Sequence, residues 1–287
     1  KIDAIIEEFG ENDVGKKQVP APAAEKIAKA SKEEMEQAQE LNLPYRRLVG
    51  LLQHVAVSSR PDIAHTVSTL GRYSAYAGPQ HFRRALHLVN YLKETRDKKI
   101  HIAPNDPKNL RLVTYTDADW AKDEIDRSSV SGMVTFCAGI PIHWQSKNQS
   151  KSATSTCEAE YVAAWTGCKS ILALRSVMKE LGVPQEQPTP LMCDSSSAIM
   201  IATGQGINSN IRHVDTAYHR IRQEIQDGQI LMKKVPGDDN IADVFTKSLT
   251  RIPFESLTES LWGGPYDEAK WSHIQAGEDP SGSEEPI

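Results

Sequence analysis

The spacing of apolar residues changes after Asn105-Asp-Pro107, and this change constrains the fold more than any other feature of the chain. Before it, apolar residues recur every three or four positions, as they do on one face of a helix. After it, they first alternate with other residues, which is typical of strands. The order predicted from there on is βββαβα(α)βα. We therefore expect an α/β domain of about 140 residues preceded by a small helical unit.

The helical unit is predicted over residues 44–104. Its first apolar stripe starts at Pro44 and stops near Ser58, and two further stripes run over 63–73 and 82–92. Residues 1–43 contain Pro and Ala stretches and charged runs, so we interpret them as a connector that is partly disordered. Ser31 followed by Glu34 fits a capping box that opens a short helix there. We thus expect a compact bundle of three helices behind a loosely structured leader.

The α/β domain is predicted over residues 108–250. Its expected strands are 110–116, 130–137, 140–145, 191–193 and 229–235, and its expected helices are 156–181, 195–202, 214–226 and 241–249. The first three strands follow one another closely and predict an antiparallel meander. Residues 251–287 are counted as an acidic tail rich in polar residues, which we expect to be disordered.

Charge is unevenly distributed along the chain. The formal net charge is -5, yet residues 41–100 hold 10 Lys and Arg against 3 acidic residues. A basic segment beside an acidic domain suits a phosphate-binding lobe, although ordinary variation between segments explains it equally well. No run of 18 apolar residues occurs, so we expect no spanning helix and no membrane partner.

The cysteines and the first residues indicate where the protein is located and whether the chain is a fragment. The four Cys show no C-x-x-C spacing, which disfavours a zinc knuckle or a disulfide framework. A reducing, intracellular location is therefore expected. The sequence starts without Met and without the pattern of a secretory signal, so we expect a fragment of a longer chain.

Four carboxylates lie at predicted strand ends and helix starts, where an α/β sheet can bring side chains together. Asp117 and Asp194 end two predicted strands, Glu160 lies in the first turns of the long helix, and Asp243 starts the last helix. Neighbouring parallel strands end at one edge, so these acids can converge. Clustered carboxylates repel one another unless a cation such as Mg²⁺ lies among them, and two such ions serve phosphodiester cleavage. Taken singly, an Asp after a strand is more often a turn former or helix cap.

Five motifs then appear in order, and together they resemble the RNase H domain of Ty1/copia-type retrotransposon polyproteins. They are Tyr115-Thr-Asp-Ala-Asp-Trp120, Ser155-Thr-Cys-Glu-Ala-Glu-Tyr-Val-Ala-Ala164, Cys193-Asp-Ser-Ser-Ser-Ala-Ile199, Arg212-His-Val-Asp-Thr-Ala-Tyr-His-Arg-Ile221 and Asp239-Asn-Ile-Ala-Asp-Val-Phe-Thr-Lys247. Upstream, Tyr45-Arg-Arg-Leu-Val-Gly-Leu-Leu52, Arg60-Pro-Asp-Ile-Ala64 and Tyr91-Leu-Lys93 resemble the segment that joins that domain to the reverse transcriptase, like its thumb or connection. The resemblance covers about residues 44–250.

The resemblance implies an RNase H-like mixed sheet of five strands flanked by helices, and a metal-dependent hydrolase that cuts the RNA strand of RNA–DNA hybrids. Carried over by motif, Asp117, Glu160, Asp194 and Asp243 are the catalytic residues and the ligands of two Mg²⁺ ions, for which Mn²⁺ can substitute. One ion, between Asp117 and Asp243, would activate the attacking water. The other, shared with Glu160 and Asp194, would stabilise the leaving 3′ oxygen. The implied partners are the hybrid duplex and the rest of the reverse transcriptase.

Three details qualify this assignment. Glu158 and Glu160 lie about 200° apart around a helix and cannot share a site, and we choose Glu160 because Tyr-Val-Ala-Ala follows it. Asp119 faces the same side of the strand as Asp117 and is a further candidate. The loop 235–240 lacks the His that cellular RNases H often carry there, and the chain lacks the Tyr-x-Asp-Asp hairpin of a polymerase.

Contacts to nucleic acid are predicted for residues outside the carboxylate group. The loop 145–151 carries Lys147 and Lys151 toward the long helix, and Ser155 begins that helix. Arg212 and His213 belong to the fourth motif. A plain solvated loop explains the two lysines equally well, so these assignments rest mainly on the resemblance.

Two other functions are compatible with the sequence. The alternative is a catalytically inactive or co-opted module that grips nucleic acid without cutting it. A strand-transferring enzyme with the same carboxylates is disfavoured by the motifs around Glu160 and Asp243. For the hydrolase, we expect an intracellular location, in a cytoplasmic element particle or in the nucleus.

Overall fold

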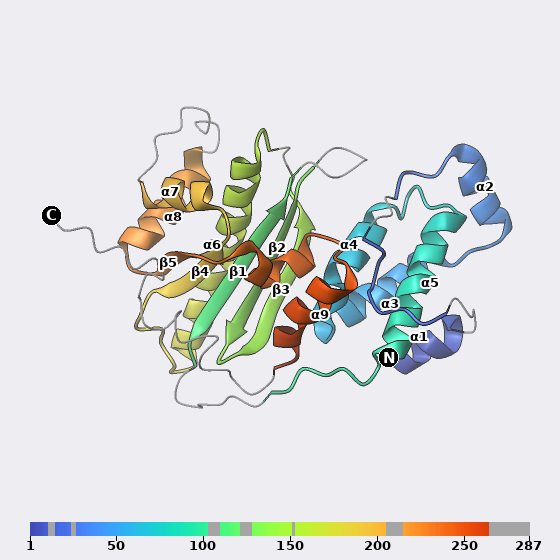
Figure 1. Ribbon diagram of the computed structural model, residues 1–287, viewed down its shortest axis with the longest axis horizontal. Coiled ribbons are helices and arrows are strands. Elements are labelled where there is room, and N and C mark those ends of the chain that lie inside the picture. The colour runs from blue at the N-terminus through green and yellow to red at the C-terminus, as the bar shows by residue number, and fades with distance from the viewer. Residues whose placement is uncertain are drawn as a thin grey trace.

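A computed structural model describes residues 1–10, 15–23, 27–102, 110–120, 128–150, 153–204 and 215–263, with only the backbone described for 215–219. The molecule is elongated, with the sheet toward one end and the N-terminal helices at the other (Figure 1). The sheet holds five strands in the order β3-β2-β1-β4-β5. Sheet and helices are joined through residues 95–111, of which 103–109 lie outside the described ranges. The predicted limits of the two units therefore stay predictions.

The sheet combines antiparallel and parallel pairing. Strands β1 (Leu112–Asp119), β2 (Val130–Cys137) and β3 (Ile140–Asn148) form the predicted antiparallel meander. Strand β4 (Thr189–Cys193) lies parallel to β1, and β5 (Ile230–Lys234) lies parallel to β4. This is the mixed five-stranded sheet of the RNase H-like fold, so the predicted fold class is confirmed.

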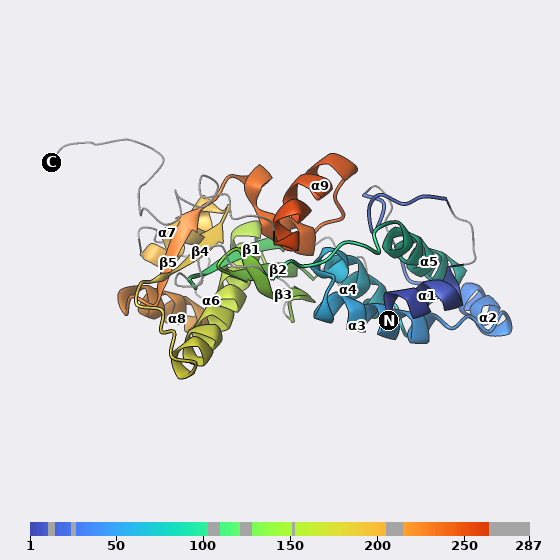
Figure 2. The same ribbon diagram turned by 90° about the horizontal axis from the view of Figure 1, so that it is seen from below.

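Each face of the sheet buries its own apolar cluster, as the alternation along strands requires. On one face, Leu191, Cys193 and Ile230 pack with α6 (Thr156–Glu180), α7 (Ser196–Thr203) and α8 (Asp215–Gln226). On the other, Tyr115 and Phe136 pack with the short 3-10 helix η4 (Ile241–Phe245) and with α9 (Arg251–Glu259). Figure 2 shows α6 and α8 on one side of the sheet and α9 on the other.

The N-terminal unit is larger than the three predicted helices. Those three are α3 (Tyr45–Ser58), α4 (Ala64–Arg72, preceded by η1, Pro61–Ile63) and α5 (Pro79–Glu94). Helix α2 (Lys32–Glu40) begins at the predicted capping box, in which Ser31 and Glu34 satisfy each other's backbone N–H. The structure differs for α1 (Ile2–Phe9), because Ile5 and Phe9 are buried in the core instead of lying in a connector. Their spacing of four places both on one face of that helix.

The helical unit and the sheet share one hydrophobic cluster. Trp144 of β3 donates its indole N–H to the backbone carbonyl of Ala56, at 2.9 Å. Tyr91 of α5 meets Phe254 of α9 edge to face, with ring centres 6.0 Å apart. The backbone N–H of His101 donates to the carbonyl oxygen of Trp262 at 2.7 Å. The helices are thus fixed against the sheet by apolar packing and by polar contacts.

Two expectations about the elements that follow β5 were wrong. The predicted helix 241–249 is the short η4, and the chain turns away after Thr246. Part of the predicted disordered tail is ordered, since α9 and η5 (Ser260–Trp262) cover residues 251–262. The physical reason is burial, because Phe254, Leu257 and Leu261 enter the shared cluster at helical spacing. Residues 264–287 lie outside the described ranges.

Candidate active site

Asp117 and Asp194 lie at one edge of the sheet because β1 and β4 are parallel neighbours. The register pairs Thr116 with Cys193, so the residue after each is an aspartate at the same level. Asp117 is 1% exposed, whereas Asp194 is half-buried. The structure therefore brings together the two strand-end acids that sequence reasoning singled out.

Glu160 reaches the same edge from α6, which approaches the sheet unusually closely at Gly167. A Cβ atom on Gly167 would lie 2.5 Å from Thr116 Cγ2 and 2.9 Å from Leu191 Cδ1, so only glycine allows this distance. Gly167 lies about two turns after Glu160, on the same side of the helix. The rejected candidate, Glu158, accepts hydrogen bonds from Thr154 N and Oγ1 at the helix start.

Asp243 is carried by η4, which lies tightly against β2. A Cβ atom on Gly132 of β2 would come within 2.6 Å of Thr246 Cγ2 and 2.8 Å of Phe245 Cβ. Asn240, fully buried, donates its side-chain amide to Thr116 O at 3.1 Å and accepts from Ala242 N at 3.2 Å. These contacts fix η4 beside the end of β1, next to Asp117.

The four predicted carboxylates form one group. One oxygen each of Asp117, Asp194 and Asp243 lie within 4.8 Å of one another. Glu160 shares a second such set with Asp194 and the thiol of Cys193. The oxygen Oε2 of Glu160 is buried and has no hydrogen-bond partner among the described residues. A buried carboxylate oxygen without a donor indicates a missing cation or donor.

Burial, together with the charges of neighbouring carboxylates, raises the pKa of three acids in this group. Burial, with the charges of Asp117 and Asp194, raises the pKa of Glu160 to about 9. Burial and Asp117 raise the pKa of Asp243 to about 7, and the pKa of Asp194 is raised for the same reasons. Without a bound cation, the group therefore retains protons near neutral pH.

Among the described residues, Lys247 forms ion pairs with two of these carboxylates, and sequence reasoning missed it as a site residue. Lys247 Nζ lies 2.9 Å from Asp243 Oδ1 and 3.4 Å from Asp117 Oδ2. Burial lowers the pKa of Lys247, but Asp117 and Asp243 raise it above its ordinary value overall. Thr246 also donates its hydroxyl hydrogen to Asp117 Oδ2. The sequence signal was present, since Lys247 follows Asp243 by four residues and ends the fifth motif.

The chemistry of the group fits a hard divalent cation. Four carboxylates supply oxygen ligands only, which Mg²⁺ and Mn²⁺ prefer. Cys193 is fully buried, and burial raises the pKa of its thiol, so it is a poor ligand beside them. Asp194 belongs to both sets.

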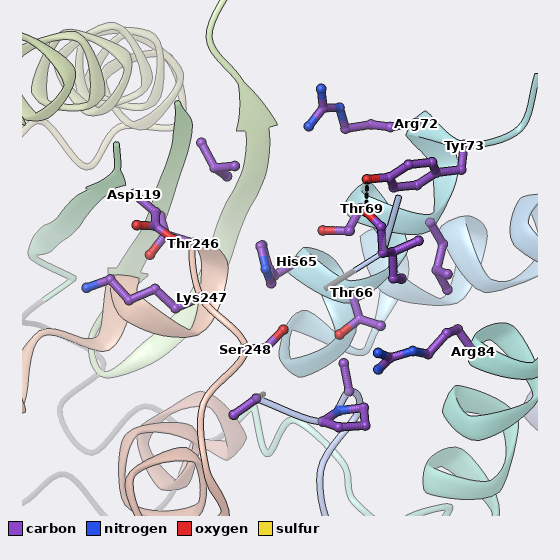
Figure 3. A pocket seen from close by; sticks show the side chains of 16 residues that line it. His65, Thr66, Thr69, Arg72, Tyr73, Arg84, Asp119, Thr246, Lys247 and Ser248 are labelled. Atoms are coloured by element: carbon purple, nitrogen blue, oxygen red, sulfur yellow. Dashed lines mark hydrogen bonds between the residues drawn. The ribbon is translucent and has the colours of Figure 1, made fainter. Parts of the chain in front are cut away.

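The other predicted contact residues are only partly described. Lys147 is exposed on β3, and Ser155 is the N-cap of α6, where its hydroxyl accepts from Glu158 N. Lys151, Arg212 and His213 lie outside the described residues. Asp119 is outside the carboxylate sets and instead lines a neighbouring pocket with Thr246 and Lys247 (Figure 3).

Sheet order and converging carboxylates together define an RNase H-like domain with a docked helical unit. The chain belongs to the Pol polyproteins of Ty1/copia-type retrotransposons, to which it is homologous over 76% of its length. It is 36% identical over 217 residues to the Retrovirus-related Pol polyprotein from transposon TNT 1-94 of Nicotiana tabacum, and 31% identical to that from transposon RE2 of Arabidopsis thaliana. The chain spans only 16% and 15% of these relatives.

A relative of another kind is Secreted RxLR effector protein 161 of Plasmopara viticola. It is 34% identical over 122 residues, which are 42% of this chain and 84% of that protein. No protein-family profile matches the chain. None of the helices within the described ranges has both the length and the apolar character needed to cross a membrane.

Solved structures similar to the chain are RNases H. LC11-RNase H1, isolated from compost, is 16% identical with a TM-score of 0.38, and the match covers 48% of this chain and 93% of that one. The N-terminal RNase H domain of rv2228c from Mycobacterium tuberculosis is 13% identical with a TM-score of 0.37, covering 53% and 98%. At these scores, the fold class rests on the sheet order itself.

Proposed function

We propose that the chain hydrolyses the RNA strand of RNA–DNA hybrids with the help of two divalent metal ions. The observation that carries the proposal is the group of four carboxylates from four separate elements, with a buried Glu160 oxygen that lacks a hydrogen-bond donor among the described residues. Repulsion between the carboxylates destabilises such a group, and bound cations neutralise this repulsion. Homology to Pol polyproteins supports a ribonuclease H above other phosphodiester hydrolases.

The carboxylates have distinct parts in this proposal. Asp117, Asp194 and Asp243 would hold one ion, and Glu160 with Asp194 would hold the second. Bound Mg²⁺ supplies activation of the attacking water and stabilisation of the leaving oxygen. Thr246 and Asn240 keep Asp117 and η4 in place, so the ligands are positioned before a metal binds. An A-like duplex is recognised through its phosphates and 2′-hydroxyls, so little sequence preference is expected.

The test is cleavage of an end-labelled RNA–DNA hybrid in Mg²⁺ or Mn²⁺. Wild type should cut the RNA strand, and Asp194→Asn should lower the rate by about two orders of magnitude or more while hybrid binding persists. Asp238→Asn is the matched control, because Asp238 is an exposed acid outside both carboxylate sets and should leave the rate unchanged.

The second candidate is a module that binds nucleic acid without cutting it. Co-option of this kind is compatible with the match to a protein named as a secreted effector instead of a transposon protein. Folded wild type that binds the hybrid but cuts it with neither ion would support this alternative against the hydrolase. Cutting that survives Asp194→Asn would contradict the assigned carboxylates.

A further inference from the structure

A pocket lies between the helical unit and the carboxylate edge of the sheet (Figure 3). One wall is the face of α4, together with Arg84 of α5 and residues 21–23 of the leader. The opposite wall is formed by residues 246–248 after η4 and by the ends of β1 and β2. The pocket therefore exists only because the two units are docked against each other.

The helical wall carries side chains of types that can bind phosphate. His65, Thr69 and Arg72 lie on one face of α4 at spacings of four and three, and Arg84 adds a second guanidinium. Figure 3 shows His65 directed toward the opposite wall, where Ser248 offers a hydroxyl. Guanidinium groups and hydroxyls donate hydrogen bonds to phosphate oxygens. Asp119 is the one carboxylate among the residues lining this pocket.

The opposite wall of the pocket lies next to the carboxylate group. Lys247 lines the pocket, while its ammonium group lies 2.9 Å from Asp243 and 3.4 Å from Asp117. Thr246 likewise lines the pocket and contacts Asp117. A strand with one phosphodiester at the carboxylates would thus place neighbouring phosphates beside the pocket.

We propose that this pocket binds backbone phosphates of the nucleic acid next to the phosphodiester at the carboxylates. The inference rests on the proposed function and gives the helical unit a part in it: α4 and α5 form half of the substrate groove. Arg72 and Arg84 supply guanidinium groups to this pocket, and both also make contacts within the protein. With the Asn148 amide oriented to accept a hydrogen bond, its oxygen lies 2.7 Å from the guanidinium of Arg72. A substitution of Arg72 would therefore affect the structure as well as phosphate binding.

The experiment measures hybrid binding without cleavage. A fluorescein-labelled RNA–DNA hybrid is titrated in EDTA at several salt concentrations, and fluorescence anisotropy gives the Kd and its salt dependence. Arg84→Gln should raise the Kd about tenfold and lower the slope of log K against log salt by about one. Arg84→Lys, which keeps the charge, should retain most of the affinity.

Arg83→Gln is the matched control. Arg83 precedes Arg84 on α5 and is exposed, is not among the residues lining the pocket, and its loss changes the net charge equally. Equal Kd values and slopes for the two glutamine variants, with both folded by circular dichroism, would overturn the inference.

Failure of the inference and failure of the proposed function are distinguishable. Wild type that cuts hybrids while Arg84→Gln binds as Arg83→Gln does would refute the pocket alone. Wild type that binds but never cuts would refute the hydrolase, and the comparison of Arg84 with Arg83 would still decide the pocket. Absence of any binding would overturn both.

Discussion

Lys247 supplies, in the protein without metal, part of the positive charge that the carboxylates require. Its ammonium group bridges Asp117 and Asp243, whose mutual repulsion it reduces. A divalent cation that binds at the same carboxylates must therefore compete with this lysine. Lys247 is thus expected to influence how tightly metal binds and how stable the protein is without metal.

Replacing Lys247 by Met tests this balance. Lys247→Met should destabilise the metal-free protein by about 1 to 3 kcal/mol, because a buried carboxylate pair loses its counter-charge. Mg²⁺ should then raise the melting temperature of the variant more than that of the wild type, since the added cation replaces the lost charge. Thermal unfolding in EDTA and in Mg²⁺ measures both effects.

Lys179→Met, at the exposed end of α6, serves as the control and should change neither quantity appreciably. An identical Mg²⁺ response in wild type and Lys247→Met would contradict the competition.

The raised pKa values predict how stability depends on pH. Folding raises the pKa of Glu160 from 4.5 to about 9 and that of Asp243 from 3.8 to about 7. The folded protein therefore binds more protons than the unfolded chain, and stability without metal falls as the pH rises from about 5 to 9. Glu160→Gln should remove part of this slope and stabilise the protein by about 1 to 3 kcal/mol at pH 8. Urea unfolding in EDTA at several pH values, with Glu158→Gln as control, measures the difference.

Helix α6 reaches the site because glycine lets it lie close to the sheet. Gly167→Ala would place a methyl group 2.5 Å from Thr116 Cγ2, so the helix must move or the strand must yield. We expect a loss of about 1 to 3 kcal/mol in the free energy of unfolding, and weaker metal binding because Glu160 moves with the helix. Chemical denaturation and metal titration measure the two effects.

Gly50→Ala in α3 is the contrasting control. No atom lies within 4 Å of the position that a methyl group on Gly50 would take, so alanine there should stabilise the protein by about 0.4 to 1 kcal/mol. Destabilisation by both substitutions would show that space beside α6 is not the cause.

Elements with a clear internal pattern could be predicted from the sequence, and those decided by distant contacts could not. The strand 130–137 was predicted to the residue, because alternation and flanking turns are local signals. Helix α1 was missed because its packing against α5 and α3, which are distant in the sequence, makes it part of the core. Asp117 and Asp194 could be placed at one sheet edge in advance, and the spacing of four residues indicated a contact between Lys247 and Asp243. The contact of Lys247 with Asp117 could not be predicted, because it depends on where η4 packs beside β1.

At the level of the whole molecule, a buried ion pair stands where the two units meet. Arg60 forms a salt bridge to Asp62 at 2.7 Å, with both side chains almost fully buried. The hydroxyl of Tyr91 donates to Asp62 Oδ2, and the guanidinium of Arg60 lies 5.5 Å from the ring centre of Trp262. The pair thus links α5 to the segment after α9.

Asp62→Asn should destabilise the entire chain by about 3 to 5 kcal/mol, because it leaves the Arg60 charge buried without a counterion. Helices and sheet should unfold in one transition, since they share an apolar cluster. Circular dichroism and tryptophan fluorescence should give coincident curves. Asp97→Asn, at a side chain that is 94% exposed, should change stability by less than about 0.5 kcal/mol. Two separate transitions would contradict a common core.

The shared cluster also limits how this chain can be divided. An RNase H-like piece that starts at residue 108 would leave behind α3 and α5, which cover Trp144 and Phe254. The uncovered patch would be apolar, and patches of that kind drive self-association in water. We therefore expect the RNase H-like unit to remain monomeric only when these helices, or another protein surface, cover the patch.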